Sequence, residues 1–359
     1  IYCFINKRIK LIMAYTTINK STDYFNTKLY TGNGGTQSIT GVGHKPDLVW
    51  VKQRNGAAYH QLTDAVRGVN SQSASNDAGM GGSNTCLTGF NSDGFALGSN
   101  GDVNANSKNY VSWNWKANGQ GSSNTDGTIN STYTSASTTS GFSIVQFTGT
   151  GANATVGHGL GVAPTVIITR PTSQSGTWRV FAEFLGNTQY LTLNTGVAQA
   201  TGSTMWNGSP TSSVFTLGSS GDTNGNNVTF TSYCFAEKQG FSKFGSYVGN
   251  GNADGAFTYT GFKPSWVLIK NTATTSSWYM YDNKRPSVYN PNGTVLFANE
   301  ETAESTNTAS GEHPIDFLSN GFKIRTTSSA RNGSGNKIFF MAFAEAPLVG
   351  SNNLPANAR

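Results

Sequence analysis

Apolar residues along this chain fall in short runs that are separated by stretches rich in Gly, Ser, Thr and Asn. Residues 110–115, 232–236 and 340–344 alternate between large and small side chains. A period of two places aromatic rings on one face of a strand and small residues on the other. We find no apolar period of 3.6 residues sustained over ten positions, so long helices are not expected. The pattern predicts an all-β protein built from short strands.

The same order of signals occurs three times. An aromatic residue opens each copy, and two glycines follow it within residues 30–34, 147–151 and 247–251. A Gly-x-x-Pro motif then leads into an apolar run at residues 48–52, 166–170 and 266–270. An aromatic strand closes each copy at Trp115, Phe235 or Phe343. A period of roughly 100 residues exceeds the 20 to 50 residues of solenoid repeats, so each copy is expected to be a small domain.

The repeats divide the chain into three tandem β-sandwich modules of roughly 100 residues, each formed by two short sheets that face each other. We expect an N-terminal arm, three modules, a linker rich in Gly, Ser, Thr and Asn, and a C-terminal tail. Their predicted ranges are 1–23 for the arm, 24–118, 141–239 and 240–346 for the modules, 119–140 for the linker, and 347–359 for the tail.

The first twelve residues differ in composition from the rest of the chain. One hypothesis is that Met13 is the native start and that residues 1–12 are a non-native leader. The alternative is a genuine arm that docks on a neighbouring molecule. The apolar stretch is short and interrupted, so insertion into a membrane is not expected.

Composition narrows the class of protein. Only 12% of the 359 residues are charged, about half the usual share, whereas 12% are aromatic and can supply packed cores. Half of the net charge of +6 comes from Lys7, Arg8 and Lys10, and no other basic run exists, which argues against nucleic-acid binding. The three cysteines do not recur at matched positions, so a repeated disulfide framework is excluded and folding in a reducing cytoplasm is favoured.

Two copies carry an Asp and an Arg at matched offsets, 18 and 21 residues after the motif proline. The pairs are Asp64 with Arg67 and Asp282 with Arg285, whereas the middle copy has Ala182 and Leu185. We interpret each pair as a structural ion pair that anchors a loop. A catalytic Asp is the alternative.

Oxygen-rich loops recur in two copies, with Asp102 and Asn104 in one and Asp222 and Asn224 in the other. Such Asp-x-Asn loops can bind Ca²⁺, because hard cations take carboxylate and amide oxygens. The third copy lacks the Asp, and Asx turns explain these residues without a metal. We therefore expect no cofactor, with calcium as the alternative.

Aromatic residues after polar turns are candidates for ligand binding. They are Tyr59, His60, Trp178 and Trp278, at 13 or 14 residues beyond each motif proline, and Trp206 in a polar loop. Exposed rings stack on sugars and anchor protein interfaces. The alternative, which we favour for the matched positions, is that these rings pack under their own loops.

Signals for catalysis are missing. The four histidines lie at different offsets within their copies, and no His-x-x-x-His, Ser-His-Asp or Cys-x-x-Cys arrangement occurs. No spacing favours a pair of carboxylates for glycoside hydrolysis. We expect that the protein is not an enzyme.

Residues 24–34, 45–52, 110–117, 344–350 and 354–359 resemble structural proteins of marine bacteriophages. The resemblance covers nearly everything after Met13, and its motifs are strand and turn residues that bring no catalytic residue with them. Proteins of this kind are tail or tail-fibre components with lectin-like sandwiches. The resemblance therefore implies modules of jelly-roll or concanavalin-like type.

The function that the resemblance implies is that of a virion structural protein of the tail, made in the host cytoplasm and displayed on the virion surface. We expect contacts with other virion subunits and with a glycan or protein receptor of the host, and a homotrimer. One alternative is a purely architectural protein, such as a capsid decoration, head fibre or tail adaptor. Another is a secreted lectin or filament subunit.

Overall fold

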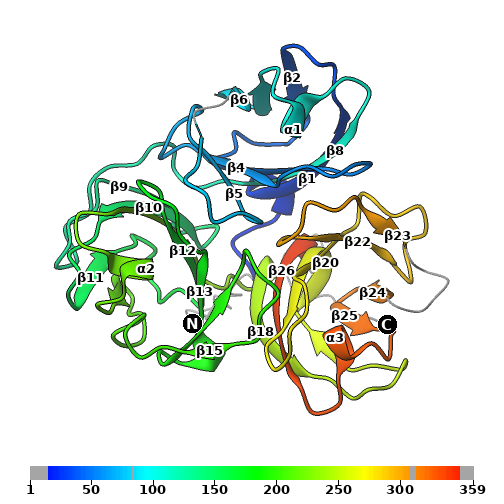
Figure 1. The fold of residues 1–359 in the computed structure, drawn as a ribbon. Coiled ribbons are helices and arrows are strands. Elements are labelled where there is room, and N and C mark those ends of the chain that lie inside the picture. The colour runs from blue at the N-terminus through cyan, green and yellow to red at the C-terminus, as the bar shows by residue number, and fades with distance from the viewer. Residues whose placement is uncertain (1–14, 83–84, 307–312, 348–359) are drawn as a thin grey trace, which may run out of the picture.

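The computed structural model describes residues 15–82, 85–306 and 313–347. It confirms the predicted all-β class, since antiparallel strands form six sheets in this part of the chain. The sheets come in three pairs, and each pair is made from one stretch of sequence. Figure 1 shows the three pairs arranged around a common centre. The only helices among the described residues are short turns.

The first sheet pair contains a five-stranded sheet in the order β1-β8-β3-β4-β5 and a three-stranded sheet in the order β2-β7-β6. A 3-10 turn, η1 (Ser21–Asp23), precedes it. Its elements are β1 (Phe25–Thr31), β2 (Gln37–Thr40), β3 (Leu48–Gln53), β4 (Gln61–Asp64), β5 (Gln72–Ala74), β6 (Leu87–Asn91), β7 (Gly94–Leu97), α1 (Gly101–Asn104) and β8 (Asn109–Trp115).

The second sheet pair has a seven-stranded sheet in the order β15-β14-β13-β12-β17-β10-β9 and a two-stranded sheet of β11 and β16. Its elements are β9 (Tyr133–Ser137), β10 (Phe142–Thr148), β11 (Ala154–Gly157), β12 (Val166–Pro171), β13 (Arg179–Ala182), η2 (Glu183–Leu185), β14 (Gln189–Thr192), β15 (Ala200–Thr201), β16 (Val214–Leu217), α2 (Gly221–Asn224) and β17 (Thr229–Phe235).

The third sheet pair has a six-stranded sheet in the order β18-β26-β20-β21-β22-β23 and a three-stranded sheet in the order β19-β25-β24. Its elements are β18 (Ser242–Val248), β19 (Phe257–Tyr259), β20 (Phe262–Asn271), β21 (Tyr279–Asp282), β22 (Thr294–Phe297), β23 (Ser305–Thr306), β24 (Ile315–Leu318), β25 (Gly321–Ile324), α3 (Ser329–Asn332) and β26 (Lys337–Pro347).

Each sheet pair encloses an apolar cluster of its own, and a fourth cluster lies where the three large sheets meet. Strand β8 shows how one strand serves two cores. Its alternation directs Trp113 and Trp115 into the shared cluster, whereas Tyr110 faces the cluster of the first sheet pair. Strands β17 and β26 divide their side chains in the same way. We call this fourth cluster the shared core.

The shared core is close-packed. Trp115, Trp266 and Phe343 come from two sheet pairs, and their ring centroids lie 5.7 to 5.9 Å apart. The cavity at its centre has a volume of about 20 Å³ and a purely apolar lining. A cavity of this size is too small for any ligand larger than water. The three sheet pairs therefore each have a core and are also joined to one another through the shared core.

The predicted linker 119–140 is wrong from Ile129 onward. Strand β9 pairs antiparallel with β10, and Ile129 belongs to the core of the second sheet pair. Within the predicted arm, Ile18 is buried in the shared core. The hypotheses about residues 1–12, and the predicted tail beyond Pro347, lie outside the described residues.

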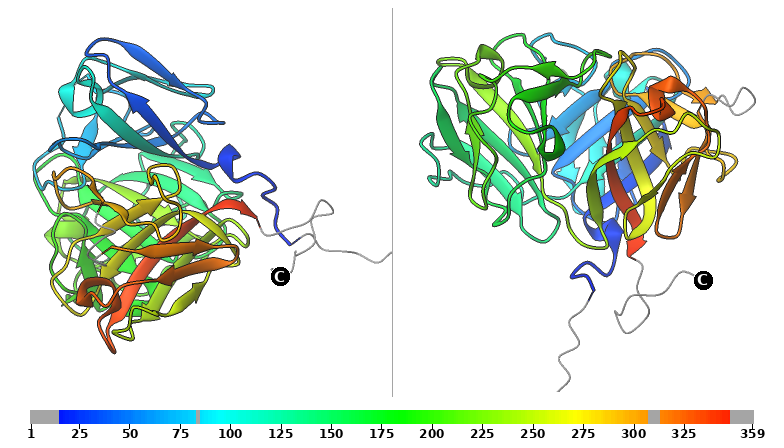
Figure 2. Two further views of the ribbon diagram at one scale, coloured as in Figure 1. Left: turned by 90° about the vertical axis from the view of Figure 1, so that its right-hand side faces the viewer. Right: turned by 90° about the horizontal axis from the view of Figure 1, so that it is seen from below.

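The described chain begins and ends on one side of the molecule (Figure 2). Tyr15 donates a hydrogen bond from its hydroxyl to the carbonyl of Gly261, at 3.2 Å. Lys263 pairs with Glu345, near the end of β26, at 2.8 Å. Over the stretches that the structure covers, no helix is long and apolar enough to cross a membrane.

Candidate functional site

The matched aromatic positions are buried at the junctions between sheet pairs. Trp178, Trp278 and His60 are each 0% exposed. Each ring reaches a backbone carbonyl of the neighbouring sheet pair: Trp178 Nε1 donates to Ala74 at 2.8 Å, Trp278 Nε1 donates to Thr192 at 3.0 Å, and His60 Nε2 lies 3.0 Å from the carbonyl of Phe297. The three carbonyls hold equivalent register positions opposite β4, β13 and β21. Three equivalent contacts thus close a ring of junctions.

The prediction that these aromatic residues bind a ligand is corrected by their burial. A ring without exposed surface offers no face to a sugar. Trp206 is 1% exposed and packs edge-on against Phe181 at 5.6 Å, inside the core of the second sheet pair. Tyr59 alone among these candidates is exposed, at 40%. The three buried rings are packed, as the favoured alternative holds. Trp178 lies against Tyr233, Trp278 against Phe339 and His60 against Trp113, each within its own sheet pair. Each ring also meets one backbone carbonyl of the neighbouring sheet pair.

His60 is held in one protonation state by its two partners. Trp50 Nε1 donates to His60 Nδ1 at 2.8 Å, so the ring proton belongs on Nε2, which donates to Phe297. Burial lowers the pKa of His60 well below 6.5, and the charge of Lys52 lowers it further. The junction between the third and first sheet pairs therefore contains a neutral imidazole.

The predicted Asp–Arg ion pairs are present. Arg67 Nε lies 2.6 Å from Asp64, and Arg285 Nε lies 2.6 Å from Asp282. Each carboxylate also accepts a hydrogen bond from a ring of another sheet pair. Tyr233 donates from its hydroxyl to Asp64 at 2.9 Å, and Trp113 Nε1 donates to Asp282 at 3.0 Å. Both ion pairs are thus parts of junctions.

The absence of the Asp–Arg pair from the middle copy is explained by the residue that would face it across the junction. The register of β26 places Met341 where β8 has Trp113 and β17 has Tyr233. Met341 has no hydrogen-bond donor. The residues in place of Asp and Arg, Ala182 and Leu185, are apolar and belong to or pack on the shared core. At this position two junctions therefore have an ion pair and the third has only apolar side chains.

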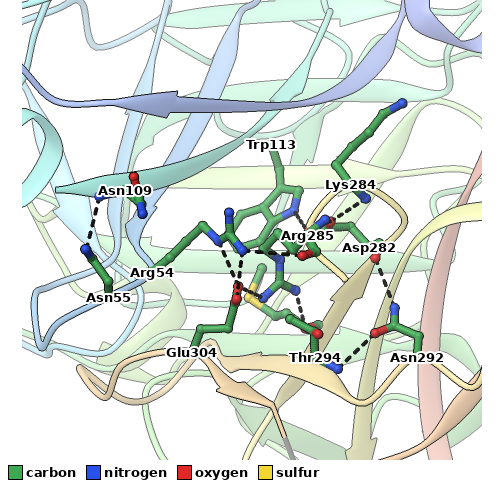
Figure 3. Close-up of polar contacts among 11 residues, drawn as sticks. Arg54, Asn55, Asn109, Trp113, Asp282, Lys284, Arg285, Asn292, Thr294 and Glu304 are labelled. Atoms are coloured by element: carbon green, nitrogen blue, oxygen red, sulfur yellow. Dashed lines mark hydrogen bonds and ion pairs between the residues drawn. The ribbon is translucent and has the colours of Figure 1, made fainter. Parts of the chain in front are cut away.

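Figure 3 shows the most extensive of the polar junctions. The guanidinium of Arg285 lies 3.0 Å from Glu304, which also pairs with Arg54 of the first sheet pair at 2.8 Å. Burial lowers the pKa of Arg285, but Asp282 and Glu304 raise it by more, so the guanidinium stays charged. The network joins loops that lie about 230 to 250 residues apart in the sequence.

The candidate calcium residues lie at the short helical turns α1 and α2. Asp102 accepts a hydrogen bond from Gln61 at 2.8 Å, and Asp222 forms an ion pair with Arg179 at 2.6 Å. Among the described residues, no group of three or more His, Cys, Asp and Glu side chains could hold a metal.

The asparagines at these turns hold the adjacent loops in place through hydrogen bonds. Asn104 Nδ2 donates to the carbonyl of Gly98 at 2.8 Å, and Asn224 Nδ2 donates to Gly218 at 2.9 Å. Asn332 makes the equivalent contact with Thr326 at 2.8 Å, although its loop lacks the Asp. Each side-chain oxygen accepts a backbone N–H, as Asn332 does from Asn250 at 2.9 Å. The repeated Asn is thus explained by loop structure in all three copies.

A polar cleft lies between the first and second sheet pairs, with a volume of about 320 Å³. Apart from Arg67, its side chains are neutral amides and hydroxyls, among them Gln72, Gln146, Thr172 and Ser173. The guanidinium of Arg67 is committed to Asp64, Ser73 and Tyr233. Gln72 is 3% exposed, and its Oε1 has no hydrogen-bond partner within the described structure. We call this feature the junction cleft.

The residues of the junction cleft carry no signal in the sequence. Gln72 and Gln146 come from different repeats and meet only because the sheet pairs pack together. Neutral polar residues are common throughout this chain, so neither position stands out. Only the contact between two repeats makes them neighbours.

Fold and site together define an all-β protein with three sheet pairs around a shared core and a polar cleft between the first and second of them. A family model with the description "Domain of unknown function (DUF7483)" matches residues 20–347. The chain belongs to this family. No curated protein is significantly similar to it.

Proposed function

We propose that the protein is a structural component of a bacteriophage particle, associated with the tail, that contacts a neutral glycan of the host surface through the junction cleft. The resemblance of its strands and turns to phage structural proteins supports the first part. The composition and geometry of the cleft support the second. The cleft is the single observation that carries the binding proposal.

The chemistry of the cleft suits a sugar. Amide and hydroxyl groups both donate and accept hydrogen bonds, as sugar hydroxyls do. Gln72 Oε1 is a buried acceptor beside the cleft that has no hydrogen-bond partner within the described structure. The volume of the junction cleft, about 320 Å³, lies at the lower end of the range for small-ligand pockets and is enough for one or two sugar rings.

The rigidity of the molecule supports the same proposal. Arg67 forms part of both the cleft and the polar junction with Tyr233, so the cleft walls are fixed by buried contacts. A preformed site loses little conformational entropy on binding. Weak sites of this kind act together when several chains are displayed on one particle.

Binding of the purified protein to a glycan array and to host cells tests this proposal. Gln146→Leu removes a cleft amide and is expected to weaken glycan binding at least tenfold. Gln189→Leu is the matched control, because Gln189 lies in the same sheet but four strands away from β10. Equal binding by Gln146→Leu and the wild type, or no glycan binding at all, would contradict the cleft as the receptor site.

The second candidate function is purely architectural, with the sandwiches binding other virion subunits. An open sheet edge in the third sheet pair, described below, favours it. Location of the chain in a reconstruction of the particle separates the two functions. A buried junction cleft between subunits would support the architectural role, whereas a cleft that faces outward would support receptor binding.

A further inference from the structure

The third sheet pair has an open groove between its two edge strands. Strand β18 ends the six-stranded sheet and β19 ends the facing three-stranded sheet. The groove between them has a volume of about 380 Å³, and Gly245, Phe340, Phe257 and Tyr259 are among its lining residues. We call it the edge groove.

Two aromatic rings stand exposed at the rim of this groove. Phe257 is 45% exposed and Tyr259 is 60% exposed, whereas Thr258 between them is buried. In the register with the facing strands, the first sheet pair has Ser38 and Thr40 at these positions, and the second has Thr155 and Gly157. Large exposed rings at this edge are therefore a feature of the third sheet pair alone among the three.

The second sheet pair shows what covers this edge when it is filled. Ile129 donates from its backbone N–H to Thr155 of β11 at 2.9 Å, and Thr132 donates to Gln146 of β10 at 2.7 Å. Strand β9 then continues along β10 as an added antiparallel strand. Residues 127–137 thus bridge both edge strands. Ile129 lies between these strands and is only 7% exposed.

Gly245 makes the groove hollow. The pairing of β18 with β26 and of β10 with β17 makes Gly245 equivalent to Val145, a fully buried residue beneath the covering segment. A Cβ atom at Gly245 would lie 3.6 Å from Phe340, an ordinary van der Waals distance, so the glycine is not required by crowding. The third sheet pair has no side chain at this position, and none of the residues that the structure describes adds a strand to β18.

We propose that the edge groove binds an extended segment of another polypeptide, which adds a strand to β18 as residues 133–137 add one to β10. The segment is uncharged, rich in Ser, Thr and Asn, and carries one β-branched apolar residue that enters the hollow at Gly245. Exposed strand edges present free backbone N–H and C=O groups, and peptides recognise them by strand addition. Phe257 and Tyr259 close over the bound segment. This inference does not depend on the junction cleft.

A synthetic peptide with the sequence of residues 127–137, which is uncharged, is the probe, because this stretch covers the equivalent edge within the chain. Fluorescence anisotropy of the labelled peptide with the full-length protein is expected to show saturable binding. Replacement of the isoleucine in the peptide by aspartate is expected to abolish it. Absence of binding by the native peptide at millimolar protein would overturn the proposal.

Gly245→Val fills the hollow and is expected to weaken peptide binding at least tenfold. Tyr259→Ala removes an exposed ring, does not disturb a core, and is expected to weaken binding as well. Thr40→Val, at the position equivalent to Tyr259 in the first sheet pair, is the matched control and leaves binding unchanged. Full binding by both groove variants would overturn the assignment of the site.

Two further outcomes identify a different occupant. A glycan that binds the wild type and not Tyr259→Ala, together with failure of the peptide, would make the groove a sugar platform. Peptide binding that appears only after deletion of residues 1–12 would show that the chain's own N-terminal segment fills the groove, since Tyr15 reaches the carbonyl of Gly261 near Tyr259. Either result would refute a partner polypeptide.

Discussion

Asp64→Ala tests whether the junctions stabilise the whole molecule. The carboxylate is 0% exposed and lies 2.6 Å from Arg67 Nε, whose side chain is 4% exposed. Removal of the carboxylate leaves a buried guanidinium without its counter-ion and the Tyr233 hydroxyl without its acceptor. Loss of one partner of a buried ion pair costs about 3 to 5 kcal/mol. We expect the free energy of unfolding to fall by that amount.

The triple variant Asp64→Ala, Arg67→Leu, Tyr233→Phe separates the charge from the packing. It imitates the apolar junction that Ala182, Leu185 and Met341 form naturally. Replacing all members of a buried polar group by apolar residues is close to neutral, although Ser73 and the Leu62 carbonyl lose a donor, at about 1 kcal/mol each. We therefore expect the triple variant to lie within about 2 kcal/mol of the wild type.

Unfolding in guanidinium chloride, followed by tryptophan fluorescence, measures both variants. Asp23→Ala is the control, because Asp23 forms an exposed pair with Lys20 and its loss is expected to change little. A loss below about 1 kcal/mol for Asp64→Ala would show that the buried ion pair does not stabilise the junction, and a triple variant as unstable as the single one would show that the unpaired charge is not the cause.

Three further predictions concern single buried groups. Burial lowers the pKa of Lys270 to about 8, so the folded state becomes more stable as pH rises from 8 to 10.5. Over this range the stability of the wild type relative to Lys270→Met should rise by up to about 3 kcal/mol, and parallel pH profiles of the two proteins would contradict this. Burial lowers the pKa of His44 to about 4, so the free energy of unfolding should fall as pH falls from 6.5 to 4. In acid unfolding curves His44→Gln should reduce that loss by up to about 3 kcal/mol, and the same loss in both proteins would contradict the prediction. Asn332→Ala leaves the N–H of Asn250 and the carbonyl of Thr326 without these partners, so the free energy of unfolding should fall by about 3 kcal/mol in thermal unfolding. A near-neutral effect would show that the Asn332 side chain does not stabilise the loop.

The strands, the repeats and the ion pairs could be predicted from the sequence because their signals are local. Alternation in β8 marks a strand, and the matched Asp and Arg lie within one loop, at positions 64 and 67. Local spacing cannot say which residue of another repeat completes a contact. The hydroxyl of Tyr233 on Asp64 therefore appears only in the folded molecule.

The shared core had a signal in the sequence that alternation alone hides. Residues 48–51 are apolar without interruption, and all six residues of β3 are buried. A strand that is apolar on both faces must be covered on both, and one facing sheet covers only one of them. Coverage by a second sheet pair also explains why Trp178 and Trp278 are fully buried. Polar turns precede these rings, but exposure is decided by the neighbouring sheet pair that covers them.

The error about residues 119–140 has a different cause. Strand β9 is polar, with Ser and Thr at most positions, and shows no apolar alternation. Its place is set by the free edge of β10 and by the single apolar anchor Ile129, neither of which a window of sequence reveals. Composition indicated a linker because a strand held by backbone pairing needs few apolar residues.

Differential scanning calorimetry of the intact chain tests most directly the claim that three sheet pairs form one body around a shared core. We expect a single cooperative heat-absorption peak that Asp64→Ala shifts as a whole to lower temperature. Separate peaks for the repeats, of which the substitution moves only one, would contradict it.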